Sequence, residues 1–169
     1  SSSRQPVPTV PDPITSPATP QPMDISGSYR FDAPPARVWG LLMDPAAIAS
    51  CIPGCEMLEP DGDDRFRARL TVALAAITGT YDGTVVISDK VPPSSYRLTV
   101  EGQGRPGFVK GSAAIVLRPD GDGTVVDVNG TMQTGGVIAR VGQRLISGVS
   151  KLMQDRFFAC LQQTLSVRE

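Results

Sequence analysis

The sequence contains no histidine among its 169 residues, and this absence excludes several kinds of site. Histidine is the commonest general base in enzymes and the commonest metal ligand. The three cysteines, Cys51, Cys55 and Cys160, are too few for iron–sulfur ligation, and a four-ligand zinc site would need carboxylates. We therefore predict a noncatalytic protein without a metal site.

Long apolar runs and strongly basic segments are also missing. No apolar stretch approaches the roughly 20 residues that a transmembrane helix needs. Sixteen basic residues nearly balance 17 acidic ones, and no basic run is interleaved with aromatic residues. Proteins that bind nucleic acid usually show one or both of these features, so we predict no nucleic-acid binding.

The cysteines and the start of the chain favour a cytoplasmic location. The sequence has no signal-peptide-like start, and three cysteines cannot all pair within one chain. We interpret Cys51 and Cys55 as small buried thiols flanking a turn at Pro53-Gly54. A disulfide between these two residues is the alternative.

Proline is concentrated at the beginning of the chain. Residues 1–22 carry prolines at short intervals among serines and threonines. Such a segment cannot bury a core and favours extended polyproline conformations. We predict a linker or disordered segment over 1–22, tethering an upstream domain, and a folded domain over 23–169. A disordered tail or cloning remnant is the alternative for the first segment.

The remaining pattern predicts an α+β domain. Short alternating segments bounded by turn residues predict strands at 26–31, 65–74, 79–88, 96–102, 110–118 and 124–132. Two short helices are expected at 35–43 and 45–50, where prolines stand in the first turns. The order of strand, two helices, a run of strands and a final helix indicates an antiparallel sheet with its helices on one side.

The last segment, 134–169, reads as one long amphipathic helix. Its apolar residues recur close to the 3.6-residue period of a helix with one buried face: Ile138, Val141, Leu145, Val149, Leu152, Phe157 and Leu161. A long helix after an antiparallel sheet can bury that face only in the concavity of the sheet. Because this arrangement tends to enclose a cavity, our first hypothesis is a binder of apolar molecules.

Several segments resemble the family of the G subunit of carbon monoxide dehydrogenase. They are Val-Trp-Gly-Leu-Leu-Met-Asp-Pro at 38–45, Cys-Ile-Pro-Gly-Cys-Glu at 51–56, Gly-Phe-Val-Lys-Gly at 107–111, and the glycine and aromatic pattern at 135–136, 142–146 and 157–159. The resemblance covers about 23–165, in the expected order. It implies a helix-grip fold of the START-like superfamily, with a deep apolar cavity between a long helix and a curved sheet.

The resemblance also implies a function. The family accompanies molybdenum hydroxylases such as carbon monoxide dehydrogenase, and its members are implicated in membrane anchoring of these enzymes and in quinone binding for electron transfer. We therefore expect menaquinone or ubiquinone as ligand and the molybdenum hydroxylase subunits as partners. By analogy, the upstream domain would be an iron–sulfur domain, and peripheral contact would be made with the inner face of the cell membrane.

Nine apolar residues are our candidates for contact with a ligand: Trp39, Leu42, Phe108, Val109, Met132, Ile138, Val141, Leu145 and Val149. Trp39 could instead belong to the core, which is the commoner place for an aromatic residue at such a position. Gly142 and Gly148 would either leave room for a flat ring or allow close helix–sheet packing. The strand residues Tyr29, Tyr81, Tyr96 and Asp127 could orient a carbonyl, and the sequence does not distinguish among them.

Two other functions are compatible with the same sequence pattern. The domain could be an assembly module that docks the hydroxylase subunits without a ligand, or a cyclase-like enzyme on the same fold. An empty cavity of ligand size would favour the binder over the assembly module. Ionisable groups pointing into the cavity, with shifted pKa values, would favour the enzyme.

Overall fold

The computed structural model describes residues 22–73 and 77–168. The elements are β1 (Met23–Phe31), α1 (Pro35–Leu42), α2 (Pro45–Cys51), β2 (Cys55–Pro60), β3 (Arg65–Val72), β4 (Gly79–Val91), β5 (Ser95–Gly104), β6 (Gly107–Asp120), β7 (Gly123–Gly136), α3 (Val137–Arg140) and α4 (Gln143–Arg168). The predicted linker at 1–22 lies outside the described residues, apart from Pro22.

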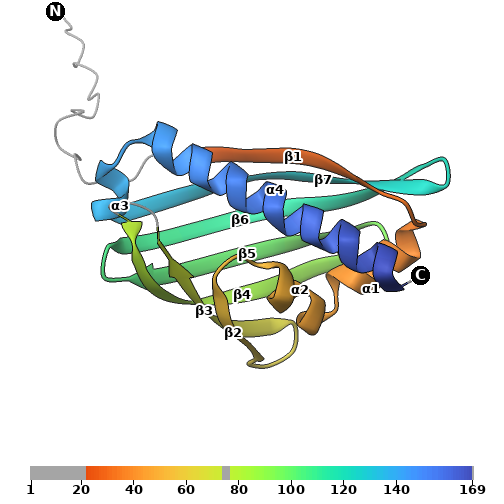
Figure 1. Ribbon diagram of the computed structural model, residues 1–169, viewed down its shortest axis with the longest axis horizontal. Helices are drawn as coiled ribbons and strands as arrows, with labels where there is room; N and C mark the ends of the chain where they lie inside the picture. Colours follow the sequence, from red (N-terminus) through yellow and green to blue (C-terminus); the bar gives the residue numbers. More distant parts are fainter. Residues whose placement is uncertain (1–21, 74–76, 169) are drawn as a thin grey trace, which may run out of the picture.

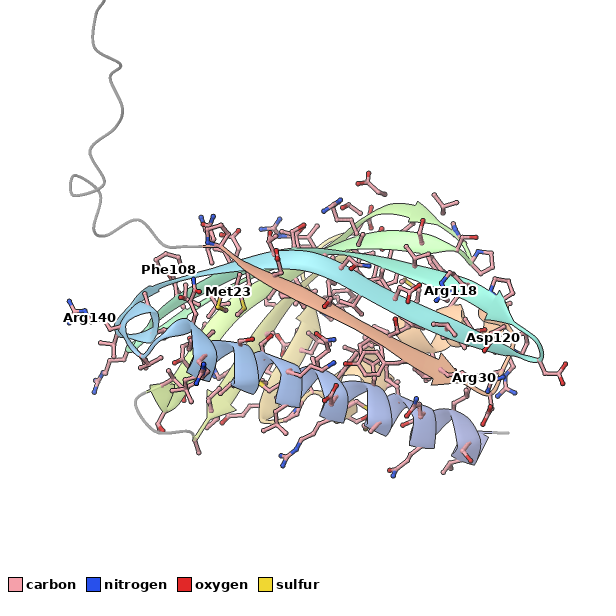
Figure 2. The ribbon with its side chains drawn as sticks, turned by 90° about the horizontal axis from the view of Figure 1, so that it is seen from above. Met23, Arg30, Phe108, Arg118, Asp120 and Arg140 are labelled. Carbon is pink, nitrogen blue, oxygen red and sulfur yellow. A yellow bond between two sulfur atoms is a disulfide. The ribbon has the colours of Figure 1, made fainter. Side chains whose placement is uncertain are left out.

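The seven strands form one antiparallel sheet in the order β1-β7-β6-β5-β4-β3-β2. The sheet curves around α4, while α1 and α2 cover one end of its concave face (Figures 1 and 2). The predicted α+β helix-grip fold is confirmed. Of these strands, β2 was not predicted; its pairing with β3 shifts register between Cys55 and Met57, which interrupts the alternation that identifies a strand.

The alternation in β3 shows how the sequence forms this sheet. Arg65, Arg67 and Arg69 are exposed, whereas Phe66 and Leu70 on the other face are half-buried. One face of the strand therefore meets solvent and the other faces α4, as expected for an antiparallel sheet covered on one side.

The predicted helix over 134–169 is wrong at its beginning. Strand β7 continues through Gly136, and the one-turn helix α3 precedes α4. Gly136 (φ 75°) and Gly142 (φ 97°) adopt backbone conformations that residues with a Cβ rarely adopt. The chain therefore changes direction twice before the long helix begins.

The buried face of α4 also differs from the predicted one. Ile146, Phe158 and Leu161 are buried, whereas Leu145 and Leu152 are 41% and 42% exposed. The predicted stripe has the correct helical period, but its first two members, Ile138 and Val141, precede α4. As a result, the predicted stripe mixes inward and outward positions.

Two apolar clusters lie beneath α4. The larger cluster joins α1, α2 and the C-terminal half of α4 to the sheet, and its fully buried side chains include Phe31, Val38 and Leu161. The smaller cluster lies beneath the N-terminal half of α4 and contains Ile77, Tyr81, Met132, Ile138 and Ile146.

A disulfide between Cys51 of α2 and Cys160 of α4 joins the larger cluster covalently. Cys55 is the free thiol, and its Sγ donates to the carbonyl oxygen of Met57 at 3.4 Å. The predicted turn at Pro53-Gly54 is present, but Cys51 is not a free thiol and its partner is not Cys55. The two bonded cysteines, Cys51 and Cys160, are 109 residues apart, and only the fold brings them together. The cysteines consequently no longer support a reducing compartment.

We expect Cys160→Ser to lower the free energy of unfolding by about 2–5 kcal/mol, because the disulfide closes a long loop in the unfolded chain. Denaturant unfolding would measure the loss, and Cys55→Ser, which removes the free thiol, is the matched control with little expected effect. Thiol labelling of the denatured, unreduced protein should find one reactive cysteine. Three reactive cysteines would contradict the disulfide.

Candidate ligand-binding pocket

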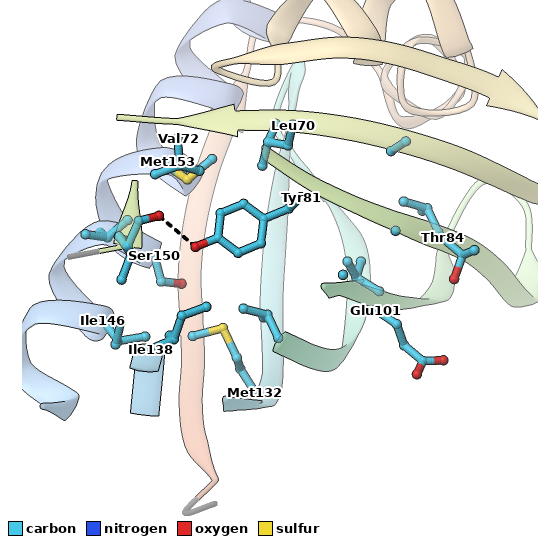
Figure 3. A pocket seen from close by; sticks show the side chains of 18 residues that line it. Leu70, Val72, Tyr81, Thr84, Glu101, Met132, Ile138, Ile146, Ser150 and Met153 are labelled. Atoms are coloured by element: carbon cyan, nitrogen blue, oxygen red, sulfur yellow. Dashed lines mark hydrogen bonds between the residues drawn. The ribbon is translucent and has the colours of Figure 1, made fainter. Parts of the chain in front are cut away.

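A pocket of about 290 Å³ lies between the N-terminal half of α4 and the concave face of the sheet (Figure 3). Its lining is predominantly apolar and comes from β3, β4, β5, β6, β7, α3, α4 and Ile77. The lining residues are Ala68, Leu70, Val72, Ile77, Tyr81, Gly83, Thr84, Val85, Val100, Glu101, Gly102, Val109, Met132, Ile138, Ile146, Val149, Ser150 and Met153.

A pair of glycines explains why this space is not filled by side chains. Gly83 of β4 lies directly opposite Gly102 of β5, and both line the pocket. A Cβ on Gly102 would meet only the carbonyl oxygen of Asp82, at 3.9 Å, whereas a Cβ on Gly83 would come within 2.1 Å of the carbonyl oxygen of Glu101. Gly102 can therefore accept a side chain, but Gly83 cannot without a backbone shift.

Two of the polar lining residues turn their side chains away from the pocket. Thr84 and Glu101 lie opposite each other on β4 and β5, and alternate with the inward positions Tyr81, Gly83 and Gly102 (Figure 3). The Glu101 carboxylate lies 3.8 Å from Lys110 Nζ, in an exposed cross-strand pair. These two residues therefore meet the pocket through their backbone.

Tyr81 and Ser150 bring hydroxyl groups to the pocket (Figure 3). The Tyr81 hydroxyl donates to the carbonyl oxygen of Ile77 at 2.6 Å. Burial raises the pKa of Tyr81, so the phenol stays protonated. Among the four strand residues proposed to orient a carbonyl, Tyr81 is the one that lines the pocket.

Four of the nine predicted contact residues line the pocket: Val109, Met132, Ile138 and Val149. They come from β6, β7, α3 and α4, so the fold brings together residues spread over some forty positions of sequence. Their role in binding stays a prediction. Val141 packs against the smaller cluster but is not among the residues that line the pocket.

Trp39 and Leu42 lie in the larger cluster instead of the pocket. Leu42 is 3% exposed, and the Trp39 ring packs edge-on against Tyr96 with centroids 5.5 Å apart. Helix α1 covers the end of the sheet opposite α3, so its side chains cannot reach the pocket (Figure 1). The alternative that we gave for Trp39, a core position, agrees with its place in the structure.

Phe108 and Leu145 point away from the pocket. Because Val109 faces inward and side chains alternate along a strand, Phe108 must lie on the convex face of β6, where its ring lies across Gly135 (Figure 2). Leu145 precedes the inward-facing Ile146 and is exposed. In each of these two neighbouring pairs, Phe108 with Val109 and Leu145 with Ile146, only the second residue lines the pocket.

The glycines of the last segment do not contribute to the pocket. A Cβ on Gly142 or Gly148 would meet nothing within 4 Å, and both residues are exposed. Neither of our interpretations, a space for a ring or close packing on the sheet, is therefore correct.

A polar network holds the middle of α4 against β1. The Tyr29 ring stacks on Phe158 with centroids 4.2 Å apart, and its hydroxyl donates to Asp155 at 2.6 Å. Gln154 Nε2 donates to the Tyr29 hydroxyl at 2.8 Å and Lys151 Nζ does so at 3.4 Å. Burial, followed by the bond to Asp155, raises the pKa of Tyr29. Tyr29 is thus an anchor for the helix that covers the pocket.

Asp127 and Tyr96 are also accounted for by structural contacts. Asp127 lies on the convex face, where it pairs with Arg118 and accepts from Ser28 at 2.6 Å, and these contacts lower its pKa. Tyr96 is buried in the larger cluster, and its burial raises the pKa of the phenol strongly. Neither residue orients a molecule in the pocket.

Sequence reasoning missed most of the strand residues that line the pocket. The signal was present in β3, where alternation places Ala68, Leu70 and Val72 on the same face. For Gly83 and Gly102 no comparable signal exists, because their importance depends on the cross-strand register.

Within the described ranges, 22–73 and 77–168, no group of three or more His, Cys, Asp or Glu residues is placed to hold a metal ion. In the same part of the chain, no helix has the length and apolar character needed to cross a membrane.

Comparison with known proteins identifies the family of this chain. Residues 27–166 match the family described as the G subunit of carbon monoxide dehydrogenase (CoxG). The chain belongs to the CoxG family. The resemblance noted from the sequence is thereby confirmed. A search of curated proteins finds no significant match.

Solved structures share the fold of this CoxG-family chain. A conserved protein from Geobacillus kaustophilus is 36% identical, with a TM-score of 0.82 over 85% of this chain and 95% of that one. The Zhui aromatase/cyclase from Streptomyces sp. R1128 is 16% identical, with a TM-score of 0.64 over 88% and 96%. A protein from Thermus thermophilus is 17% identical, with a TM-score of 0.65 over 87% and 99%. At such low identity, the last two show the fold alone. The family, the fold and the pocket together support a domain that binds a hydrophobic ligand.

All three tyrosines of this CoxG-family protein should titrate above their ordinary pKa of 10.0, since Tyr29, Tyr81 and Tyr96 are all raised by burial. The folded protein therefore holds phenol protons that the unfolded chain releases near this pH, so stability should fall as the pH rises above about 10. Ultraviolet absorbance of tyrosinate should rise later in the native than in the denatured protein. Coincident titration curves would contradict the burial of these rings.

Proposed function

We propose that this chain is a noncatalytic domain that binds the ring of a quinone, such as menaquinone or ubiquinone, or a similar apolar compound. The observation that carries the proposal is the pocket of about 290 Å³ with its predominantly apolar lining. Apolar walls exclude water from a bound ring, and one or two polar groups are enough to fix its orientation. The mechanism is therefore sequestration of the ligand.

The size of the pocket supports a ring as the bound part. Ligand pockets usually measure about 300–1,000 Å³, and this pocket, at about 290 Å³, lies at the lower limit of that range. A substituted quinone ring fits such a space, but a long isoprenoid tail does not. The tail would extend out of the pocket.

The side chains that reach the pocket favour binding over catalysis. Of its described lining residues, Glu101 is the only one with a carboxylate, and this group points away and pairs with Lys110. The Tyr81 phenol is held neutral by burial and bonded to Ile77. A general acid–base mechanism requires ionisable groups within reach of the substrate, so this lining supports a carrier rather than an aromatase/cyclase-like enzyme.

The family name supports a partner for this carrier. A component of carbon monoxide dehydrogenase would work beside a molybdenum hydroxylase, and the quinone would accept its electrons or be carried to the membrane. If residues 1–22 tether the domain to an iron–sulfur domain upstream, the linker would keep the bound quinone at high local concentration near the redox centres.

The outer surface near the pocket supports peripheral contact with the inner face of the cell membrane. Val137, Leu145 and Leu152 are each 41–42% exposed on α3 and α4. Arg140 and Arg144 are exposed on the same two helices. Exposed apolar side chains beside basic ones are suited to the headgroup region of an anionic membrane.

Organic extraction of the purified protein followed by mass spectrometry is the direct test of the proposal. A stoichiometric quinone or isoprenoid would support the carrier and identify its cargo. Clean extracts, together with no thermal shift on adding menaquinone or ubiquinone analogues, would favour the assembly module instead.

Gly102→Leu should abolish the pocket while leaving the fold intact, because the backbone leaves room for a side chain there. We expect the affinity for quinone analogues to fall more than about 10-fold, or about 1.4 kcal/mol. Calorimetric titration would measure the loss. Gln103→Leu is the matched control, because it adds an apolar side chain to the exposed, opposite face of the same strand. Equal affinities in the two variants would show that the ligand binds elsewhere.

A further inference from the structure

Among the residues that line the pocket, Ser150 is the one whose hydroxyl-bearing side chain points inward and makes no hydrogen bond to a described residue. Its neighbours on the same side of α4, Ile146, Val149 and Met153, line the pocket with it. A serine inside a helix often donates to the carbonyl four residues earlier. No such bond, nor any other, joins Ser150 to a described residue, whereas Thr164 on the same helix does donate to the carbonyl oxygen of Cys160 at 3.0 Å.

The other inward hydroxyl cannot serve as a donor to a ligand. Tyr81 uses its proton in the bond to the carbonyl oxygen of Ile77. Its oxygen can accept a second bond but has no further proton to give. The described lining therefore offers one available side-chain donor, the Ser150 hydroxyl, beside one available acceptor, the Tyr81 oxygen (Figure 3).

The charges around the pocket restrict the ligand further. No described lining residue turns a charged side chain into the pocket, since Glu101 points to the convex face. A charged group brought into this lining would lose its hydration without gaining an ionic partner, which is strongly unfavourable. A carbonyl oxygen, by contrast, is neutral and needs only one donor.

We propose that Ser150 donates a hydrogen bond to a carbonyl oxygen of a neutral ring ligand and thereby orients the ring in the pocket. The inference rests on the proposed binding function and adds to it the polar group that selects the ligand. The carbonyl edge of the ring faces α4, and its apolar body lies over the sheet near Gly83 and Gly102. Ser150 therefore makes the site prefer a quinone to a hydrocarbon of the same shape.

Two probes of the same shape test this selection. Duroquinone carries two carbonyl oxygens, and durene is the tetramethylbenzene that lacks them; methylation of the quinone ring also blocks addition of the Cys55 thiol. Binding of each probe to the full chain is measured by NMR titration. We expect Ser150→Ala to weaken duroquinone by about 3- to 10-fold, the range of one net hydrogen bond, and to leave durene unchanged.

Two further variants separate the hydrogen bond from packing. Ser150→Thr keeps a hydroxyl and should retain the preference for duroquinone, whereas Ser147→Ala removes an exposed serine from the same helix and should change neither affinity. If Ser150→Ala weakens both probes equally, or neither, Ser150 is not the donor, although the pocket still binds rings. If the unaltered chain binds neither probe, the binding function itself fails, and this inference fails with it.

Discussion

The burial of one face of α4 in the concave side of the sheet is the contact on which the rest of the structure depends. An antiparallel sheet covered on one side must hide its apolar face beneath another element, and α4 is the long helix that lies across its concave face. The contact is uneven along the helix. The C-terminal half packs on the larger cluster and is joined to α2 by the disulfide, whereas the N-terminal half spans the pocket.

This unevenness gives the two halves of the domain different roles. Beneath the C-terminal half, Phe31, Val38 and Leu161 are almost completely buried, as in an ordinary close-packed core. Beneath the N-terminal half, the facing glycines of β4 and β5 withhold the side chains that would complete such packing. A protein interior of this density tolerates few voids, so an apolar space of this size is a feature of function rather than of stability.

The convex face of the sheet carries much of the charge of the described chain, whereas the concave face carries the apolar clusters. Cross-strand pairs such as Arg69 with Asp82 and Lys110 with Glu101 are well exposed, and each such pair contributes only about 0–1 kcal/mol to stability. Their main effect is to keep that face in contact with water. The concave face is left apolar, with two hydroxyl groups at one pocket. Together with the family and the fold, this pocket supports a domain that binds a hydrophobic ligand.

The sequence by itself determined the fold class, the family and most strands, because alternation, turn residues and helical period are local signals. Alternation alone placed Leu70 and Val72 on one face of β3, and the order of short segments identified the family without reference to distances.

The tertiary structure decided which residues meet. Phe108 and Val109 are both apolar neighbours, but the direction of β6 sends one outward and one inward. Other features depend on segments that are far apart in the sequence, so no local pattern could reveal them. They are the disulfide partner of Cys51, the opposition of Gly83 and Gly102, and the inward position of the Ser150 hydroxyl without a bond to a described residue.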